Sequence, residues 1–217
     1  PENLTSPIYN FGVIPSIISK YAGQLTIVDV GRSTSLAIAF NLWKDMMQQY
    51  VKAIYIMGGV FLQPGNVTPL AEANVFGDPI ATRLLVREAK NLTMFPLNVT
   101  NQAILLPEVT DYIVNHTSIP FKSLIKPIYD YYLSAYKKLN PGIQGTPLHD
   151  VVALSALVNP TLLNYVFREV NVEILNIAKG ETVADFRRSA KSEGVRIALE
   201  INTEAFINDF IKIMTNK

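Results

Sequence analysis

Residues 53–79 read AIYIMGGVFLQPGNVTPLAEANVFGDP, and this stretch decides the fold class. Its first five residues, Ala53 to Met57, are a continuous apolar and aromatic run, which is typical of a strand buried on both faces of a parallel sheet. Its last two residues, Asp78 and Pro79, form an N-cap and a favoured first-turn proline, so a helix begins there. A strand that leads through a loop to a helix is the repeating unit of α/β proteins.

The same alternation extends along the chain. We expect further strands at residues 25–30, 92–100 with Pro96 towards the end, 170–177 and 195–201. We expect further helices at residues 15–22, from about Ser33, at 107–114 and 123–137, from His149, and after Thr203, which would cap a helix that buries Phe206, Ile207, Phe210, Ile211 and Met214. Helical spacing of apolar residues separates the helices from the strands. The sequence therefore predicts an α/β protein with an open, mainly parallel sheet flanked by helices.

The composition indicates a single globular domain over residues 1–217. Hydrophobic residues make up 49% of the chain and charged residues 17%, which excludes a disordered chain. The net charge of +1 with scattered basic residues argues against a nucleic-acid partner. The longest apolar run, Ala53 to Leu62, is too short to cross a membrane, which takes ~20 residues. Cysteine is absent, which excludes thiolate chemistry and fits a reducing, cytoplasmic compartment.

Polar residues follow two of the expected strands, where α/β proteins bind ligands. After the strand at residues 25–30, Val30 and Gly31 lead into a helix whose first amides could hold an anion or oxygen ligand, or could simply be capped. After the strand at residues 53–57, Asn66, Glu72 and Asn74 follow. An amide and a carboxylate can together donate to and accept from adjacent hydroxyls. Turn residues that bond their own backbone explain this loop equally well.

His149 and Asp150 form a third candidate site at the start of an expected helix. A protonated imidazole could act as a general acid. Asp150 could be a helix cap favoured by the helix dipole or a hard oxygen ligand for calcium. The residues alone leave both alternatives open.

Four stretches of the chain carry a resemblance when they are taken together. They are TIVDVGRSTSLAIA at residues 26–39, IYIMGGVFLQPGNVTPLAEANVFGDPIA at 54–81, LHDVVALSALVNP at 148–160 and TVADFR at 182–187. In this order, and across essentially the whole chain, they resemble the inosine-uridine preferring nucleoside hydrolase family.

The resemblance implies a Rossmann-like nucleoside hydrolase fold and hydrolysis of the N-glycosidic bond of purine and pyrimidine ribonucleosides to ribose and a free base, as in purine metabolism and nucleoside salvage. It implies calcium as the cofactor, which holds the attacking water and the ribose hydroxyls. It also implies a homo-oligomer, either a dimer or a tetramer, with a ribonucleoside as substrate and no nucleic-acid or membrane partner.

The resemblance assigns roles to the candidate residues. Asn66, Glu72 and Asn74 match ribose-binding positions. Asp150 matches a calcium-ligating aspartate, and Val30 matches a position that gives calcium its main-chain carbonyl. His149 matches the histidine that assists the leaving base, and its presence resembles the branch that is less restricted to purines.

The chain also departs from the family pattern. The family's aspartate-rich D-x-D-x-x-x-D-D segment is missing, since all eight aspartates of this chain are isolated. Ser35 replaces an asparagine, and Arg32 stands where a small residue or proline is common. We therefore expect the C-terminal two thirds of a nucleoside hydrolase, incomplete at its N-terminus, with half of a metal site. The alternatives are a non-catalytic nucleoside- or ribose-binding relative and an inactive fragment.

Overall fold

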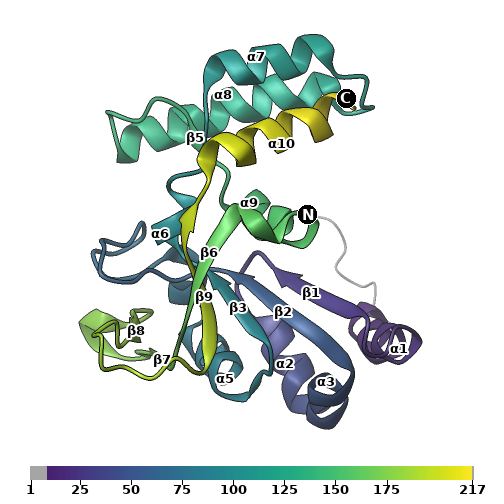
Figure 1. Ribbon diagram of the computed structural model, residues 1–217, viewed down its shortest axis with the longest axis vertical. Helices are drawn as coiled ribbons and strands as arrows, with labels where there is room; N and C mark the ends of the chain where they lie inside the picture. The colour runs from purple at the N-terminus through teal and green to yellow at the C-terminus, as the bar shows by residue number, and fades with distance from the viewer. Residues whose placement is uncertain (1–8, 217) are drawn as a thin grey trace, which may run out of the picture. The chain divides into compact units, whose positions relative to one another are not determined.

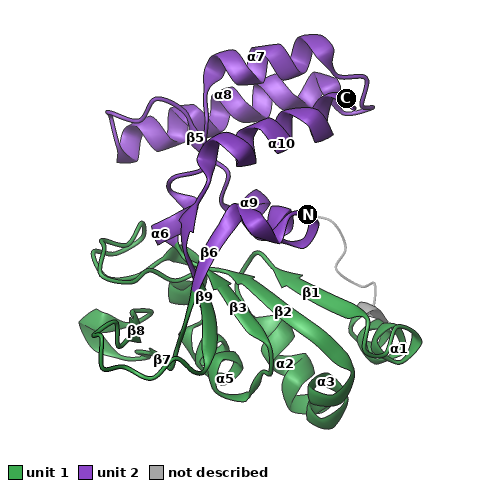
Figure 2. Ribbon diagram, in the orientation of Figure 1, with its two compact units in different colours: residues 1–96, 166–197 green, residues 97–165, 198–217 purple. Residues whose placement is uncertain are grey.

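The computed structural model describes residues 9–216, and they divide into two compact units. Of these residues, unit 1 comprises 9–96 and 166–197, and unit 2 comprises 97–165 and 198–216 (Figure 2). A five-stranded sheet has the strand order β1 (Leu25–Asp29), β2 (Val51–Met57), β3 (Leu92–Phe95), β9 (Val195–Ile201) and β6 (Leu163–Arg168). The pairs β1–β2, β2–β3 and β3–β9 are all parallel, so the predicted open, mainly parallel α/β fold is confirmed (Figure 1).

Unit 1 contains the first three strands of this sheet, with helices before and between them. Its elements up to residue 96 are η1 (Tyr9–Gly12), α1 (Val13–Lys20), β1 (Leu25–Asp29), α2 (Thr34–Leu42), α3 (Lys44–Tyr50), β2 (Val51–Met57), α4 (Ala73–Gly77), α5 (Pro79–Glu88) and β3 (Leu92–Phe95). The later part of this unit adds the hairpin of β7 (Val170–Val172) and β8 (Thr182–Ala184), with η3 (Asn176–Ala178) between them.

Unit 2 is mainly helical. Its elements are α6 (Leu97–Thr100), β4 (Ile104–Leu105), α7 (Pro107–His116), α8 (Lys122–Leu139), β5 (Thr146–Pro147), α9 (His149–Val158), η2 (Pro160–Leu162) and α10 (Thr203–Thr215). The boundaries between the units along the chain fall within the strands β6 (Leu163–Arg168) and β9 (Val195–Ile201). In the core of unit 2, α10 contributes Phe210, Ile211 and Met214, which pack against the buried Leu105, Ile113 and Tyr129.

The strands β2 and β3 in the middle of the sheet are buried. Ile54, Ile56 and Met57 of β2 are at most 2% exposed, and β3 is buried along its whole length. The continuous apolar run from Ala53 to Met57 therefore predicted this strand correctly. The Asp78–Pro79 helix start is also confirmed, since Asp78 Oδ1 accepts a hydrogen bond from the Ala81 amide at 3.0 Å.

Three expected elements differ from the structure. The strand expected over residues 92–100 ends at Phe95, because Pro96 cannot donate to a neighbouring strand, and the chain continues as α6. The strand expected at residues 170–177 covers only β7, whereas β6 had not been expected. Asn202, and not Thr203, caps α10, since Asn202 Oδ1 accepts from the Ala205 amide at 3.0 Å.

Within residues 9–216, no helix combines the length and the apolar character that a bilayer crossing needs.

Candidate functional site

The loop after β2 is organised around the carboxylate of Glu72, which is 2% exposed. Its Oε1 accepts a hydrogen bond from the Asn74 amide at 2.8 Å. Its Oε2 accepts from the amides of Val75 at 3.1 Å and Gly59 at 3.0 Å. The first two bonds cap α4, and the third holds the end of β2 against this helix. Glu72 therefore fixes the shape of the loop, whatever else it contacts.

The side chains of Asn66 and Asn74 also hydrogen-bond to backbone groups at this loop. Asn74 Nδ2 donates to the Met57 carbonyl at 3.1 Å, which ties α4 to the last residue of β2. Asn66, which is exposed, accepts at Oδ1 from the Ala73 amide at 2.9 Å. The structure therefore brings Asn66, Glu72 and Asn74 together around the start of α4, as the sequence predicts. It also shows that each of them bonds backbone groups.

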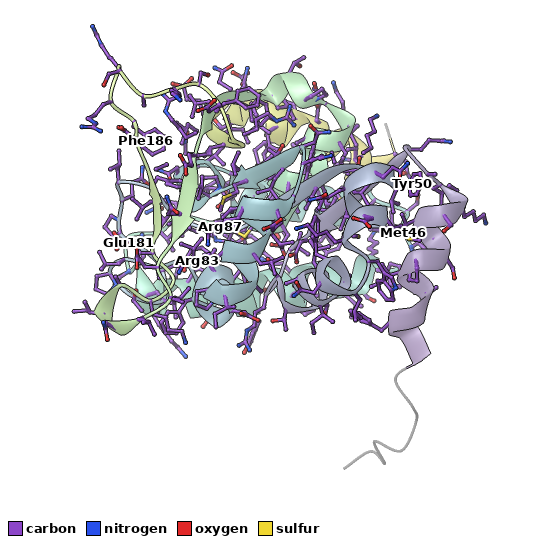
Figure 3. The ribbon with its side chains drawn as sticks, turned by 90° about the horizontal axis from the view of Figure 1, so that it is seen from below. Met46, Tyr50, Arg83, Arg87, Glu181 and Phe186 are labelled. Carbon is purple, nitrogen blue, oxygen red and sulfur yellow. The ribbon has the colours of Figure 1, made fainter. Side chains whose placement is uncertain are left out.

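A close backbone approach and a buried hydroxyl hold this loop in place. A Cβ on Gly65 would lie 2.1 Å from the Ala71 carbonyl oxygen, so only glycine fits there. Thr182, which is 4% exposed, accepts from the Val60 amide at 2.9 Å and donates to the Val60 carbonyl at 2.6 Å. The segment after β8 adds Phe186, whose ring lies 5.5 Å from that of Phe61 (Phe186 is labelled in Figure 3). Sequence reasoning noted the TVADFR stretch but assigned Thr182 no role.

Val30 follows β1 at the carboxyl edge of the sheet. Asp29 pairs with Ile56 across the parallel β1–β2 ladder, so Val30 lies beside the end of β2, where Asn74 is bonded. Val30 is 40% exposed, so its surroundings are open to solvent. Burial raises the pKa of Asp29, the carboxylate directly before it. Val30 and the three loop residues thus share one edge of the unit 1 sheet.

His149 is the first residue of α9 in unit 2, and both of its ring nitrogens are hydrogen-bonded. Nδ1 lies 2.7 Å from Thr100 Oγ1, and Nε2 lies 2.7 Å from Tyr136 Oη. The residue is 8% exposed, and burial lowers the pKa of the imidazole to about 4. The ring is therefore neutral at pH 7 in this environment. Sequence reasoning missed Thr100, because nothing in residues 97–100 indicates a contact 49 positions away.

Asp150 lies in the first turn of α9 and is exposed. Its position near the helix N-terminus favours the carboxylate through the helix dipole. Partial desolvation of this carboxylate raises its pKa. The structure therefore presents Asp150 to solvent next to the buried His149, both in unit 2.

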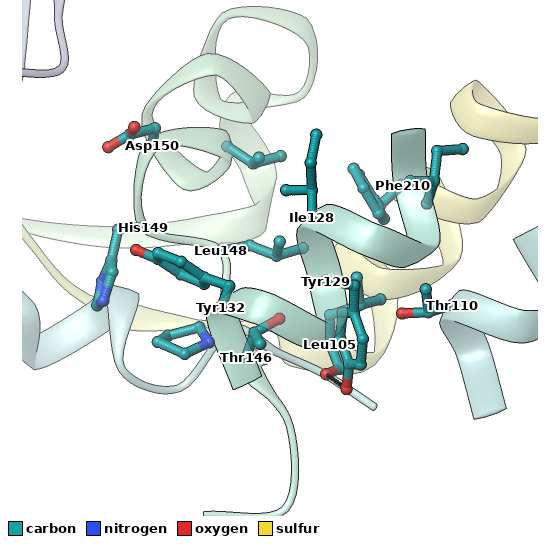
Figure 4. A pocket seen from close by; sticks show the side chains of 13 residues that line it. Leu105, Thr110, Ile128, Tyr129, Tyr132, Thr146, Leu148, His149, Asp150 and Phe210 are labelled. Carbon is teal, nitrogen blue, oxygen red and sulfur yellow. Dashed lines mark hydrogen bonds between the residues drawn. The ribbon is translucent and has the colours of Figure 1, made fainter. Parts of the chain in front are cut away.

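An apolar cavity of about 400 Å³ adjoins these two residues. It lies within unit 2, and Figure 4 shows the side chains that line it. Besides His149 and Asp150, its walls include Ile128 and Tyr132 of α8 and Leu148. Such a wall suits the faces of a flat, largely apolar ring.

The described residues supply too few oxygen ligands for the calcium site that the resemblance implies. Calcium takes six to eight oxygen ligands. Among residues 9–216, no group of three or more His, Asp or Glu side chains is placed to hold a metal ion. Asp150 and the Val30 carbonyl belong to different units, and two oxygens do not make a calcium site. The described residues therefore do not by themselves fit calcium.

The comparisons with known proteins agree on one family. A family model described as inosine-uridine preferring nucleoside hydrolase matches residues 4–208. The chain is 34% identical over 168 residues to uridine nucleosidase 1 of Arabidopsis thaliana, a match that covers 77% of this chain and 49% of that protein. It is 30% identical over 196 residues to the inosine-uridine preferring nucleoside hydrolase of Leishmania major, covering 89% of this chain and 61% of that protein.

A solved structure gives the same result. The purine-preferring ribonucleoside hydrolase from Gardnerella vaginalis superposes with a TM-score of 0.85 at 27% identity, covering 95% of this chain and 65% of that one. The chain thus spans about half to two thirds of the length of these relatives.

Proposed function

Because the chain belongs to the inosine-uridine preferring nucleoside hydrolase family, we propose that it forms the sugar- and base-binding part of an enzyme that hydrolyses ribonucleosides. In this reaction the bond from ribose C1′ to the base nitrogen breaks. The oxygen of water bonds to C1′, and the base nitrogen gains a proton. The products are ribose and a free purine or pyrimidine base.

The observation that carries the proposal is the fixed arrangement of Asn66 and Asn74 around the carboxylate of Glu72. Asn66 uses Oδ1 on the Ala73 amide, so its Nδ2 group keeps its donors for a ligand. Asn74 uses Nδ2 on the Met57 carbonyl, so its Oδ1 keeps acceptor capacity. A donor and an acceptor held on one short loop suit the adjacent hydroxyls of ribose. Rigid positioning of the sugar is a large contribution to rate.

We assign the base to the apolar cavity in unit 2. Its tyrosine and leucine side chains can pack on the faces of a purine or a pyrimidine, and this mode of contact selects little between bases. His149 lines the same cavity and is the candidate to assist the leaving base. Its two hydrogen bonds hold the imidazole in one orientation.

The family is generally metal-dependent, and calcium is our proposal for the metal. Calcium prefers hard oxygen donors, and the Asp150 carboxylate in unit 2 and the Val30 carbonyl in unit 1 are each donors of this kind. A calcium ion, if bound, would supply charge that polarises and acidifies a water molecule. The cytoplasmic location and the homo-oligomeric state stay predictions.

The test is a pair of measurements on the purified intact protein with calcium present. Reducing-sugar release from inosine and uridine is expected, with slower release for the variant His149→Ala. Calorimetry with the same nucleosides distinguishes the alternative of a non-catalytic binding protein. Binding that persists in chelator without any sugar release would support that alternative and overturn the proposal.

A further inference from the structure

The imidazole of His149 lies between two hydroxyl groups of unit 2. Thr100, the last residue of α6, contacts Nδ1 at 2.7 Å, and Tyr136 of α8 contacts Nε2 at 2.7 Å. Both partners are hydroxyl groups, and no hydrogen bond joins a carboxylate of the described residues to the ring. A neutral imidazole carries a single N–H, so one nitrogen donates and the other accepts. The two neutral tautomers of the ring differ in which nitrogen carries the proton.

The burial of Thr100 determines which nitrogen of His149 carries the proton. The Thr100 side chain is 0% exposed, so water cannot accept a hydrogen bond from its hydroxyl group. Within residues 9–216, this hydroxyl has its hydrogen bond with Nδ1 of His149. If Nδ1–H donated to Oγ1, the Thr100 proton would be buried without an acceptor, which is costly. If Oγ1–H donates to Nδ1, both groups are satisfied.

We propose that Thr100 is a positioning residue that donates from Oγ1 to Nδ1 of His149 and thereby keeps the imidazole proton on Nε2. Nε2–H then donates to the Tyr136 hydroxyl oxygen. The tautomer of a functional histidine is commonly set by the hydrogen bond at its other nitrogen. The consequence for catalysis rests on the proposed function: a proton can leave the ring only on the Tyr136 side and not on the side of the buried Thr100.

The inference has a direct spectroscopic test, because the chain has only two histidines, His116 and His149. His116 is exposed at the end of α7, so the variant His116→Gln leaves a single histidine to observe. Long-range ¹H–¹⁵N correlation spectra at neutral pH distinguish a protonated ring nitrogen from an unprotonated one. We expect His149 to show a protonated Nε2 and an unprotonated Nδ1. A protonated Nδ1, with or without a protonated Nε2, would overturn the proposal.

A pair of variants tests the role of the hydroxyl. Thr100→Val keeps the shape and removes the donor, and it should shift the ratio of the two tautomers roughly tenfold towards Nδ1–H, the effect of losing one hydrogen bond. Thr100→Ser keeps the donor and should retain the original spectrum. An unchanged spectrum in Thr100→Val would show that Tyr136 alone sets the tautomer and would contradict the proposal. If Thr100→Val does not fold, the spectrum of His116→Gln still decides.

These spectra separate the inference from the proposed function. They need neither substrate nor metal, so a protein that hydrolyses no nucleoside can still confirm or refute the role of Thr100. In an active protein, Thr100→Val should lower kcat more than it raises KM, and Thr100→Ser should restore kcat.

Discussion

Replacing Glu72 by alanine should destabilise the protein strongly, even in the absence of any ligand. The substitution removes a carboxylate that is 2% exposed and accepts hydrogen bonds from the amides of Gly59, Asn74 and Val75. Hydrogen bonds to a charged group contribute about 1.5–3 kcal/mol each, and a buried amide left without a partner costs about 1–3 kcal/mol. Because such losses overlap at one site, we expect a total of about 3–5 kcal/mol.

Urea unfolding followed by circular dichroism measures this loss, and thermal unfolding should show a Tm lower by roughly 10 °C for a chain of this size. Asn66→Ala is the matched control in the same loop. It removes one hydrogen bond at an exposed residue, so it should cost less than about 1 kcal/mol. Glu72→Gln keeps one acceptor oxygen and should fall between the two.

The result that would refute this reasoning is a loss below about 1 kcal/mol for Glu72→Ala, equal to that of Asn66→Ala. The carboxylate would then not hold the start of α4, and its part in the protein would be confined to binding a ligand.

Three further substitutions test other contacts. Thr182→Val removes both hydrogen bonds to the Val60 backbone and should cost about 2–3 kcal/mol in urea unfolding, whereas Thr182→Ser should stay near the parent value. Gly65→Ala places a Cβ 2.1 Å from a carbonyl oxygen and should cost about 2 kcal/mol or more, whereas Gly31→Ala meets no atom within 4 Å and should be tolerated; equal losses would contradict the geometry. Arg187→Ala should raise the pKa of Asp185 from about 2 towards 3.8, because the hydrogen bond to the Arg187 side chain is the largest cause of the lowered pKa. Carboxyl NMR measures this change. Any stabilisation from this pair is present above pH 3.8 and is lost as the pH falls towards 2.

The sequence predicted the parts of the fold that depend on local patterns. The apolar run from Ala53 to Met57 and the Asp78–Pro79 helix start need only neighbouring residues to be recognised, and both are confirmed. The strand β6 was missed, because LNYVFR at residues 163–168 contains the polar residues Asn164 and Arg168 and is only partly buried. The strand β1 lies at the other edge of the same sheet and was predicted from its apolar run, so the pattern within a strand decides whether it is recognised.

The candidate site divides in the same way. Asn66, Glu72 and Asn74 lie within nine residues, so a single loop could be predicted to bring them together. Thr100 and His149 are 49 positions apart, and Thr182 and Val60 are 122 positions apart. Contacts at such separations depend on tertiary packing and cannot be predicted from the spacing of residues in the sequence.

The central claim is that this chain belongs to an enzyme that splits ribonucleosides with water. Chromatography of inosine and of uridine incubated with the purified protein and calcium, in buffer free of phosphate, measures it most directly. Free hypoxanthine and free uracil are expected, formed more slowly by His149→Ala. Intact nucleosides after incubation, with calcium shown to be bound, would contradict it.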